Sequence, residues 1–212
     1  MLGQYLGAGS TITKGLWHFE GNSNDSSGNT NNGTDTDITY GLAYGKFGQG
    51  ALFNGASSKI ALSKNSTTYL YNDWTMAVWA KRGSTTSGTD GIYQMGNCVL
   101  GFGFASYYDG SAGRLVVDSS VPTDTTNWYF YVWTKSSSSG QKLYRNGVLV
   151  GTQASTSNNS DSYSKVNIGR FDSPGNSWFN GTLDEFILEG RIWSASDIKK
   201  YYTYAKGRFG LL

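Results

Sequence analysis

The chain has 212 residues, of which 38% are hydrophobic and 15% aromatic, so it can bury one sizeable core that is rich in aromatic side chains. Charged residues make up only 15% and the formal net charge is +2, and together with the many aromatics this composition excludes an intrinsically disordered chain. Lysine and arginine are scattered apart from the basic stretch 191–208, so we expect no nucleic-acid partner.

The sequence indicates neither a signal peptide nor a membrane span, and it leaves the role of the polar stretch at 19–34 open. Residues 1–10, MLGQYLGAGS, lack the features of a signal peptide, and no segment is apolar for long enough to span a membrane, so we expect no membrane insertion. Residues 19–34, FEGNSNDSSGNTNNGT, hold one apolar side chain, Phe19, among polar residues and two acids. This stretch has three possible interpretations: a metal-binding loop, a flexible linker, or a loop that is specific to one fold.

Alternating patterns predict two strands in the middle of the chain. Residues 74–81, WTMAVWAK, alternate with the period of two that is typical of a strand. Residues 128–135, WYFYVWTK, are apolar at both alternating sets of positions, as expected for a central strand that is covered on both faces. Cys98 lies in the apolar run CVLGFGF, so we expect a buried thiol, and a single cysteine excludes an internal disulfide.

A hairpin is the clearest local prediction. Asn146-Gly147 lies between two short apolar runs, and a two-residue type I′ turn needs positive φ at both positions, which these residues tolerate. With the turn SSSSG before it, the hairpin predicts a meander of strands 128–135, 141–146 and 148–153. Further strands are expected at 165–171 and 181–193.

One helix is predicted after these strands. Ser194 and Asp197 have the spacing of a capping box, and Gly207 is placed to end the helix. Between them apolar residues recur at helical spacing: Ile198, Tyr201, Tyr202 and Ala205. The many short strands with glycine-rich turns therefore predict an all-β fold, an antiparallel jelly-roll β-sandwich with one short C-terminal helix.

Six segments, in this order and with these spacings, resemble one family. They are GLWHFEGNSNDSSGNTNNGT, YGKFGQGALFNGASSKIAL, W-x-M-x-V-W, NWYFYVWTKSSSSGQKLYRNGVLVG, NIGRF and FNGTLDEFILEGRIWSASDIKKYY. The family is the laminin-G-like, concanavalin A-like lectin/glucanase superfamily, and the resemblance runs from Gly15 to Tyr202. It implies a sandwich over 15–206 between an N-terminal arm, 1–14, and an apolar tail, 207–212. The polar stretch at 19–34 is then an ordered loop after the first strand.

The resemblance also implies a candidate calcium site. In this family the terminal strands share a sheet, and Asp184 is then expected near Glu20 and Asn22, with Asp25 supplying a further oxygen. Calcium prefers six to eight oxygen ligands, and carboxylates and amide carbonyls provide them. The alternative is that the same side chains cap backbone turns without an ion.

No arrangement of residues predicts catalysis. Glycoside hydrolysis needs a pair of carboxyl groups, and the chain has only three glutamates, at positions 20, 185 and 189. Asp184 and Glu185 are adjacent and are expected to point to opposite faces of their strand, and Asp35 and Asp37 lie in a polar loop. A triad would have to use the single histidine, His18, and a zinc site needs more histidine and cysteine than the chain has. We therefore expect a protein that is not an enzyme.

Binding of a glycan is the remaining chemical possibility. Sugars stack their apolar faces on exposed aromatic rings while polar side chains hold the hydroxyl groups. The candidates in loop-like contexts are Tyr107, Tyr108, Asp172, Asn176, Arg170 and Trp178. The alternative is that these aromatics only complete the core. Core positions are expected for Trp17, Trp74, Trp79, Trp128 and Trp133.

Two function classes follow. The first is a non-catalytic surface attachment or decoration module, as on a virus or phage particle, that contacts partner proteins through its ends, forms oligomers and binds host glycans. The apolar side chains in MLGQYLGAGSTIT and KGRFGLL favour this class, with a location on a particle surface or otherwise outside the cell. The alternative is a lectin-like carbohydrate-binding module of a polysaccharide-degrading or adhesion system. Fold alone does not choose between them.

Overall fold

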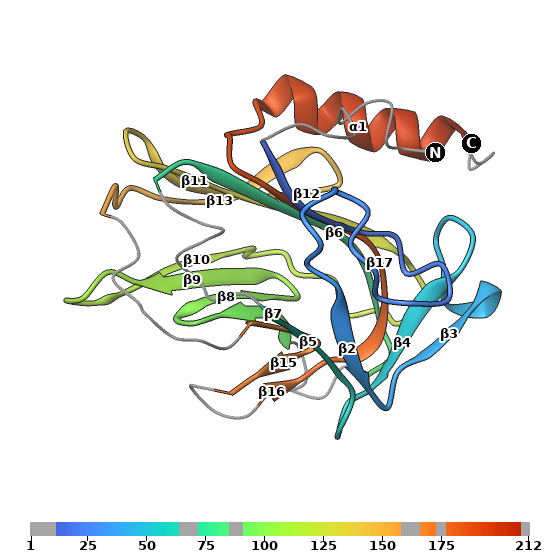
Figure 1. Cartoon of the computed structure of the whole chain (residues 1–212). Helices are drawn as coiled ribbons and strands as arrows, with labels where there is room; N and C mark the ends of the chain where they lie inside the picture. The colour runs from blue at the N-terminus through green and yellow to red at the C-terminus, as the bar shows by residue number, and fades with distance from the viewer. Residues whose placement is uncertain (1–11, 64–71, 85–90, 158–165, 173–176, 209–212) are drawn as a thin grey trace.

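The structure, a computed structural model, describes residues 12–63, 72–84, 91–157, 166–172 and 177–208. They form two antiparallel sheets stacked face to face, with one helix across the outer face of one sheet (Figure 1). The predicted all-β sandwich with a C-terminal helix is confirmed. The apolar ends, residues 1–11 and 209–212, lie outside the described residues.

Sheet A has eight strands, in the order β13-β12-β11-β6-β17-β4-β3, with β1 paired to β17. Their bounds are β1 Thr13–Trp17, β3 Thr39–Gly41, β4 Gly50–Asn54, β6 Trp74–Arg82, β11 Tyr129–Ser136, β12 Gly140–Arg145, β13 Val148–Gln153 and β17 Asn180–Glu189. The first strand and the strand that carries Asp184 therefore share a sheet, as the resemblance implied. Because β1 begins at Thr13, the last two residues assigned to the N-terminal arm belong to the sandwich.

Sheet B has seven strands, in the order β10-β9-β8-β7-β14-β5-β2. Their bounds are β2 Gly33–Thr36, β5 Lys59–Leu62, β7 Gly91–Met95, β8 Cys98–Gly101, β9 Phe104–Tyr108, β10 Gly113–Val117 and β14 Val166–Ile168. A separate two-stranded hairpin is made of β15, Arg170–Phe171, and β16, Ser177–Trp178. A short 3₁₀ helix covers Leu42–Tyr44, and α1 covers Ala195–Arg208.

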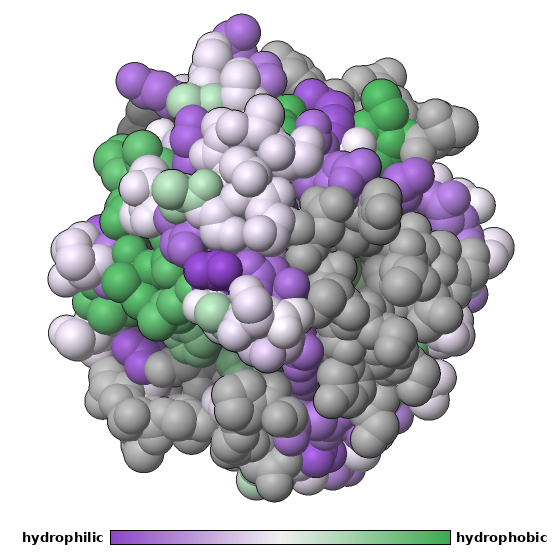
Figure 2. Space-filling model, turned by 90° about the vertical axis from the view of Figure 1, so that its left-hand side faces the viewer, coloured by the Kyte–Doolittle hydropathy of each residue, from purple (hydrophilic) through white to green (hydrophobic). Residues whose placement is uncertain are grey.

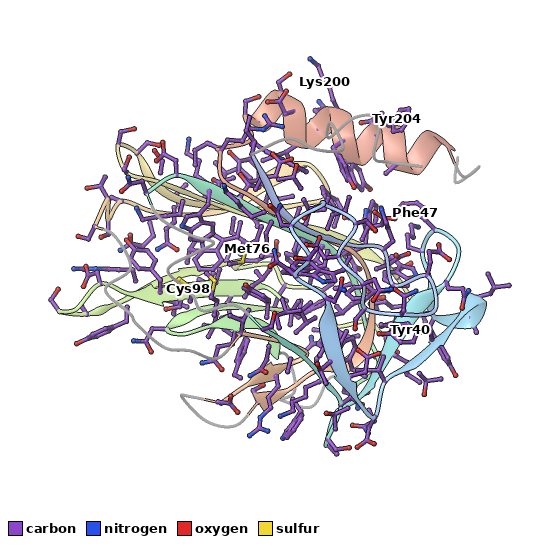
Figure 3. All side chains as sticks on the ribbon, viewed as in Figure 1. Tyr40, Phe47, Met76, Cys98, Lys200 and Tyr204 are labelled. Carbon is purple, nitrogen blue, oxygen red and sulfur yellow. The ribbon has the colours of Figure 1, made fainter. Side chains whose placement is uncertain are left out.

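Two hydrophobic clusters hold the layers together. In β6 the side chains of Trp74, Met76 and Val78 belong to the cluster between the sheets, whereas Ala77 and Trp79 belong to a second cluster beneath α1. Figure 3 shows the labelled Met76 and Cys98 between the two sheets. Strand β11 alternates in the same way, so the prediction of a central strand covered on both faces is confirmed.

The predicted turn and cap are both present. Asn146 and Gly147 have φ of 52° and 80°, and Arg145 pairs with Val148, which is the type I′ hairpin. The Asp197 backbone N–H donates to Ser194 Oγ, while the Ser194 N–H and hydroxyl donate to Asp197 Oδ2, which completes the capping box. Gly207 does not end the helix, which continues to Arg208.

A bulge in β17 corrects one prediction. The register of β17 against β6 shifts between Asp184 and Ile187, and Glu185 has a φ of 50°. The extra residue places Asp184 and Glu185 on the same, helix-facing side, because Leu183 and Phe186 both lie in the cluster between the sheets. The expectation that the two acids point to opposite faces is therefore wrong.

Candidate functional site

The β15–β16 hairpin lies against the outer face of sheet B (Figure 1). It follows β14 after Gly169, whose φ of 86° turns the chain and whose N–H donates to Ile92 O. A Cβ at Gly169 would lie 2.2 Å from the Phe53 ring, so the turn has room for glycine alone. Phe171 is buried and packs edge-on against Phe104 of β9, with ring centroids 6.0 Å apart. The hairpin is thus anchored to the sheet by an aromatic pair.

Three of the residues predicted to bind a glycan meet at this hairpin. Arg170 pairs with Trp178 across the two strands, and the guanidinium carbon lies 4.2 Å from the indole centroid. Arg170 Nε lies 2.8 Å from Asp172 Oδ1, which makes an ion pair between two partly exposed side chains. Trp178 is half-buried, so it is neither a core residue nor a fully exposed one. We call Arg170, Asp172 and Trp178 the hairpin cluster.

Two buried amides of sheet B, which the sequence did not single out, fix the position of Asp172. Asn167 Nδ2 donates to Asp172 Oδ2 at 2.9 Å, and the Asp172 backbone N–H donates to Gln94 Oε1. Both amides alternate with core residues along their strands and point to the outer face. Their signal in the sequence is a single amide inside each of the apolar segments GIYQM and VNI.

The other predicted glycan-binding residues do not join this cluster. Tyr107 is only 1% exposed, and its hydroxyl donates to the backbone carbonyl of Ser157 at 2.8 Å, so its ring is part of the core. Tyr108 points outward and is 39% exposed, at the end of β9. Asn176 lies outside the described residues. Of the predicted tryptophans, Trp128 is half-buried rather than fully in the core, and the other four are buried.

Two of the four predicted calcium ligands converge on one loop. Asp184 is fully buried, and its Oδ2 accepts the backbone N–H groups of Lys46 and Phe47 at 2.7 and 2.8 Å. Glu20 Oε2 accepts the N–H of Gln49 at 3.1 Å. Burial raises the pKa of Asp184 to about 8, and the nearby charge of Glu185 adds to this shift. Asp184 Oδ1 is buried and has no hydrogen-bond partner.

The other two predicted ligands cap turns in the 19–34 loop. Asp25 accepts the N–H groups of Leu16 and Ser27 on Oδ1 and that of Asn31 on Oδ2. Asn22 Oδ1 accepts the N–H of Asn24 at 2.9 Å, an Asx-turn. Within the described ranges, no group of three or more histidine, cysteine or acidic side chains is arranged to hold a metal. A calcium ion at Asp184 and Glu20 stays a prediction.

Glu185 and Glu189 lie beneath the helix and make contacts that hold the structure together. His18 Nδ1 lies 2.9 Å from both carboxylate oxygens of Glu185, and this hydrogen bond is the main reason that the pKa of His18 is raised. Glu189 accepts the indole N–H of Trp193 at 2.6 Å and pairs with Arg191 at 2.7 Å. These contacts tie β1, β17 and the start of α1 together.

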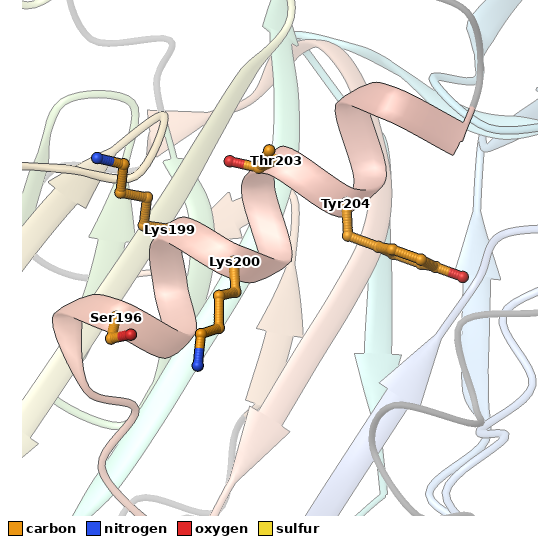
Figure 4. Close-up of a pocket in the computed structure, with 5 residues that line it drawn as sticks. All are labelled: Ser196, Lys199, Lys200, Thr203 and Tyr204. Carbon is orange, nitrogen blue, oxygen red and sulfur yellow. The ribbon is translucent and has the colours of Figure 1, made fainter.

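A further surface feature lies on α1. A hollow runs along the outer side of α1, lined by Ser196, Lys199, Lys200, Thr203 and Tyr204 (Figure 4). Among the described residues, all five side chains that line the hollow come from the helix itself. In the part of the chain that the structure describes, no helix is both long and apolar enough to cross a membrane.

Large apolar side chains are exposed where the edge strands of the two sheets meet. They are Leu115 and Val117 on β10 and Val148 and Leu149 on β13. Figure 2, which views the molecule from the left-hand side of Figure 1, shows a large hydrophobic area on its left and a smaller one at the upper right. Beside these side chains, Arg114 Nε of β10 lies 2.6 Å from Asp109 Oδ2.

Solved structures share this architecture. Domain 4 of AbnA, a GH43 extracellular arabinanase from Geobacillus stearothermophilus solved in complex with arabinotriose, has a TM-score of 0.64 and 21% identity, over 89% of this chain and 97% of that domain. The binding domain of Paraclostridial Mosquitocidal Protein 1 has a TM-score of 0.72 and 19% identity, over 91% of this chain and 52% of the other. A botulinum neurotoxin type C structure, whose cell entry depends on interaction with two ganglioside molecules, has a TM-score of 0.64 and 13% identity over 92% and 51%.

These likenesses show the fold, and the chain spans about half the length of the two toxin structures. A search of the curated proteins found no match. The family model described as "Concanavalin A-like lectin/glucanases superfamily" matches residues 54–199, which is more than half of the chain. The chain therefore belongs to the concanavalin A-like lectin/glucanase superfamily.

Proposed function

We propose that this protein is a non-catalytic carbohydrate-binding module that holds a sugar at the hairpin cluster on the outer face of sheet B. The observation that carries the proposal is the joint placement of Arg170, Asp172 and Trp178. A half-buried indole, a guanidinium and a carboxylate lie together on one surface hairpin. An aromatic platform with a few convergent polar groups is the usual composition of a small-ligand site.

The similar structures support the same class of function. The arabinanase domain was solved with arabinotriose, and the neurotoxin is described as interacting with gangliosides, which carry sugars. The arabinanase is extracellular, which supports a location outside the cell for this module also. The expectation of a particle-surface module with oligomers built through its ends stays a prediction, because those ends lie outside the described residues.

The placement of the acids supports a binding role rather than hydrolysis. Asp184 and Glu185 lie beneath α1 and are engaged with backbone N–H groups and with His18. Asp172, the one acid of the hairpin cluster, is paired with Arg170. Hydrolysis of a glycosidic bond needs two carboxyl groups about 5–10 Å apart on either side of the bond. We therefore expect no release of reducing ends from any polysaccharide on which the protein is assayed.

A glycan screen followed by one matched pair of variants tests the proposal. Trp178→Ala should weaken binding to whichever glycan is found by about 10- to 100-fold, because aromatic anchors of a binding site contribute about 2 kcal/mol or more. Trp128→Ala is the control. Trp128 is also half-buried with a cation nearby, Lys81 Nζ at 5.6 Å, but it packs against the cluster beneath α1. Equal loss in both variants, or loss in neither, would contradict the assignment.

A further inference from the structure

The hairpin cluster presents a donor and an acceptor side by side, and this feature indicates the class of sugar. Arg170 makes two contacts: its Nε lies 2.8 Å from Asp172 Oδ1 in an ion pair without hydrogen-bond geometry, and its guanidinium carbon lies 4.2 Å from the centroid of the Trp178 ring. Within the described part of the chain, no hydrogen bond occupies the two Nη groups. Arginine carries its N–H donors in a fixed fork, so these groups are pre-positioned to donate to a ligand.

The acceptor of the pair, the Asp172 carboxylate, is also held in a fixed position. Asp172 is held by Arg170, by the amide of Asn167 and through its backbone by Gln94. Its side chain keeps 23% exposure, and each carboxylate oxygen has lone pairs beyond the one contact that it makes. Because Gln94 and Asn167 are both only 5% exposed, the carboxylate is positioned by groups that belong to the rigid sheet.

We propose that Arg170 and Asp172 together recognise two adjacent hydroxyl groups of a neutral sugar, so that the module selects neutral glycans over glycans that carry carboxylates. The inference rests on the proposed function. One hydroxyl accepts from an Arg170 Nη group and its neighbour donates to Asp172, which matches the dual donor and acceptor character of hydroxyl groups. The sugar ring then lies beside the indole of Trp178.

A ligand carboxylate fits this pair poorly. Asp172 already neutralises the guanidinium at 2.8 Å, so a second carboxylate at the Nη groups would meet little net positive charge. It would also lie close to Asp172, and juxtaposed like charges at an interface repel each other. Lys59 is a basic side chain on the same outer face of sheet B, since its neighbour Ile60 points inward and pairs with Ile168 of β14. Lys59 therefore provides a control.

The first experiment compares polysaccharides of different charge on the intact protein. Debranched arabinan and a neutral galactan are the neutral probes, and polygalacturonate and vesicles that contain a ganglioside are the acidic probes. We expect binding to a neutral probe with an affinity that does not change when NaCl is added, since no net charge is neutralised. Preferential binding of an acidic probe that weakens with salt and requires Trp178 would overturn this inference while leaving the proposed function intact. Binding of none of the glycans in a broad screen would overturn both.

The second experiment changes the charge of the pair. Asp172→Asn should lower the affinity for the neutral probe by about tenfold or more, because a hydrogen bond to a charged group is replaced by a weaker neutral one. Lys59→Gln should leave that affinity unchanged. If the ligand is acidic instead, Asp172→Asn should raise the affinity and Lys59→Gln should lower it, and this result would overturn the inference. Unchanged melting temperatures and circular dichroism spectra would show that both variants are folded.

Discussion

The outer faces of the two sheets differ in what covers them. On sheet A, Trp79 and Phe130 stack on Tyr201 and Tyr202 of α1, with Trp79 and Tyr202 centroids 5.7 Å apart and Phe130 and Tyr201 centroids 5.1 Å apart. On sheet B the outer face carries the amides of Gln94 and Asn167 and the short β15–β16 hairpin. One face is a second hydrophobic core, and the other holds two buried amides beneath a hairpin whose Arg170, Asp172 and Trp178 are partly exposed.

This difference assigns different tasks to the two faces. Because α1 covers the outer face of sheet A, substitutions on that face should lower the stability of the fold. Sheet B keeps only a partial cover, and the residues that hold this cover also present Arg170, Asp172 and Trp178. Exposed aromatic and charged groups on a rigid scaffold indicate binding, whereas buried aromatics indicate packing.

The largest expected effect is a loss of stability when an aromatic side chain beneath α1 is removed. Trp79→Ala removes an indole that contacts Phe47, Phe130 and Tyr202, so the free energy of unfolding should fall by about 3–5 kcal/mol. Trp178→Ala, on the open face, should cost less than about 1.5 kcal/mol because the indole is only partly buried. Urea denaturation of both variants measures the difference. Similar losses would show that the two faces do not differ as described.

The second effect tests the buried acid beneath the helix. The pKa of Asp184 is raised to about 8, above its unfolded value of 3.8, so the folded protein keeps a proton that the unfolded chain releases. Without a bound cation, the contribution of the Asp184 carboxyl to the free energy of unfolding should therefore be greatest below pH 4. Between pH 4 and pH 8 this contribution should fall by up to about 1.4 kcal/mol per pH unit, and above pH 8 it should level off. In Asp184→Asn this decline should be absent, and a parallel decline in both proteins would contradict the assignment.

The same two proteins can be compared with and without calcium. If the ion binds Asp184 and Glu20 in the folded state only, added Ca²⁺ should raise the melting temperature of the native chain near pH 7 and a chelator should reverse the gain. Asp184→Asn should not respond. A native chain that is indifferent to both additions would leave Asp184 and Glu20 as caps for the loop around Lys46 and Gln49.

The smallest expected effect comes from removing the N-terminal cap of α1 while its aromatic side chains stay in place. Ser194→Ala removes the hydroxyl that caps α1, which should lower the free energy of unfolding by about 1 kcal/mol. Glycan binding at the hairpin cluster should be unchanged, because α1 lies across the outer face of the other sheet. Thermal melting combined with a binding titration checks both halves, and a loss of affinity in this variant would mean that the two faces are coupled.

Local features of the fold were predictable because each depends on neighbouring residues. The Asn146-Gly147 turn, the Ser194–Asp197 capping box and the alternation in β6 are determined within a few positions. The resemblance added the pairing of the first strand with β17. The predicted end of α1 at Gly207 lies one residue before the observed end at Arg208, since a glycine inside a helix costs only about 1 kcal/mol relative to alanine.

The site was predictable only in part, since it depends on contacts between distant segments. Arg170, Asp172 and Trp178 were found through their composition and proximity in sequence, but the roles of Gln94 and Asn167 require the three-dimensional pairing of β7 with β14. The aromatic pair of Tyr107 and Tyr108 has no sequence signal that tells the buried ring from the exposed one without the register of β9. The bulge at Glu185 likewise has no local signature, because a non-glycine residue adopts a positive φ there.

The most direct test of a binding face on sheet B observes all seven tryptophans at once. In a ¹⁵N–¹H spectrum each indole N–H gives one signal, which can be assigned by single substitution. On titration with a glycan that binds, we expect the Trp178 signal to move while those of Trp128 and the buried tryptophans stay in place. A shift of the Trp128 signal with a stationary Trp178 signal would contradict the account.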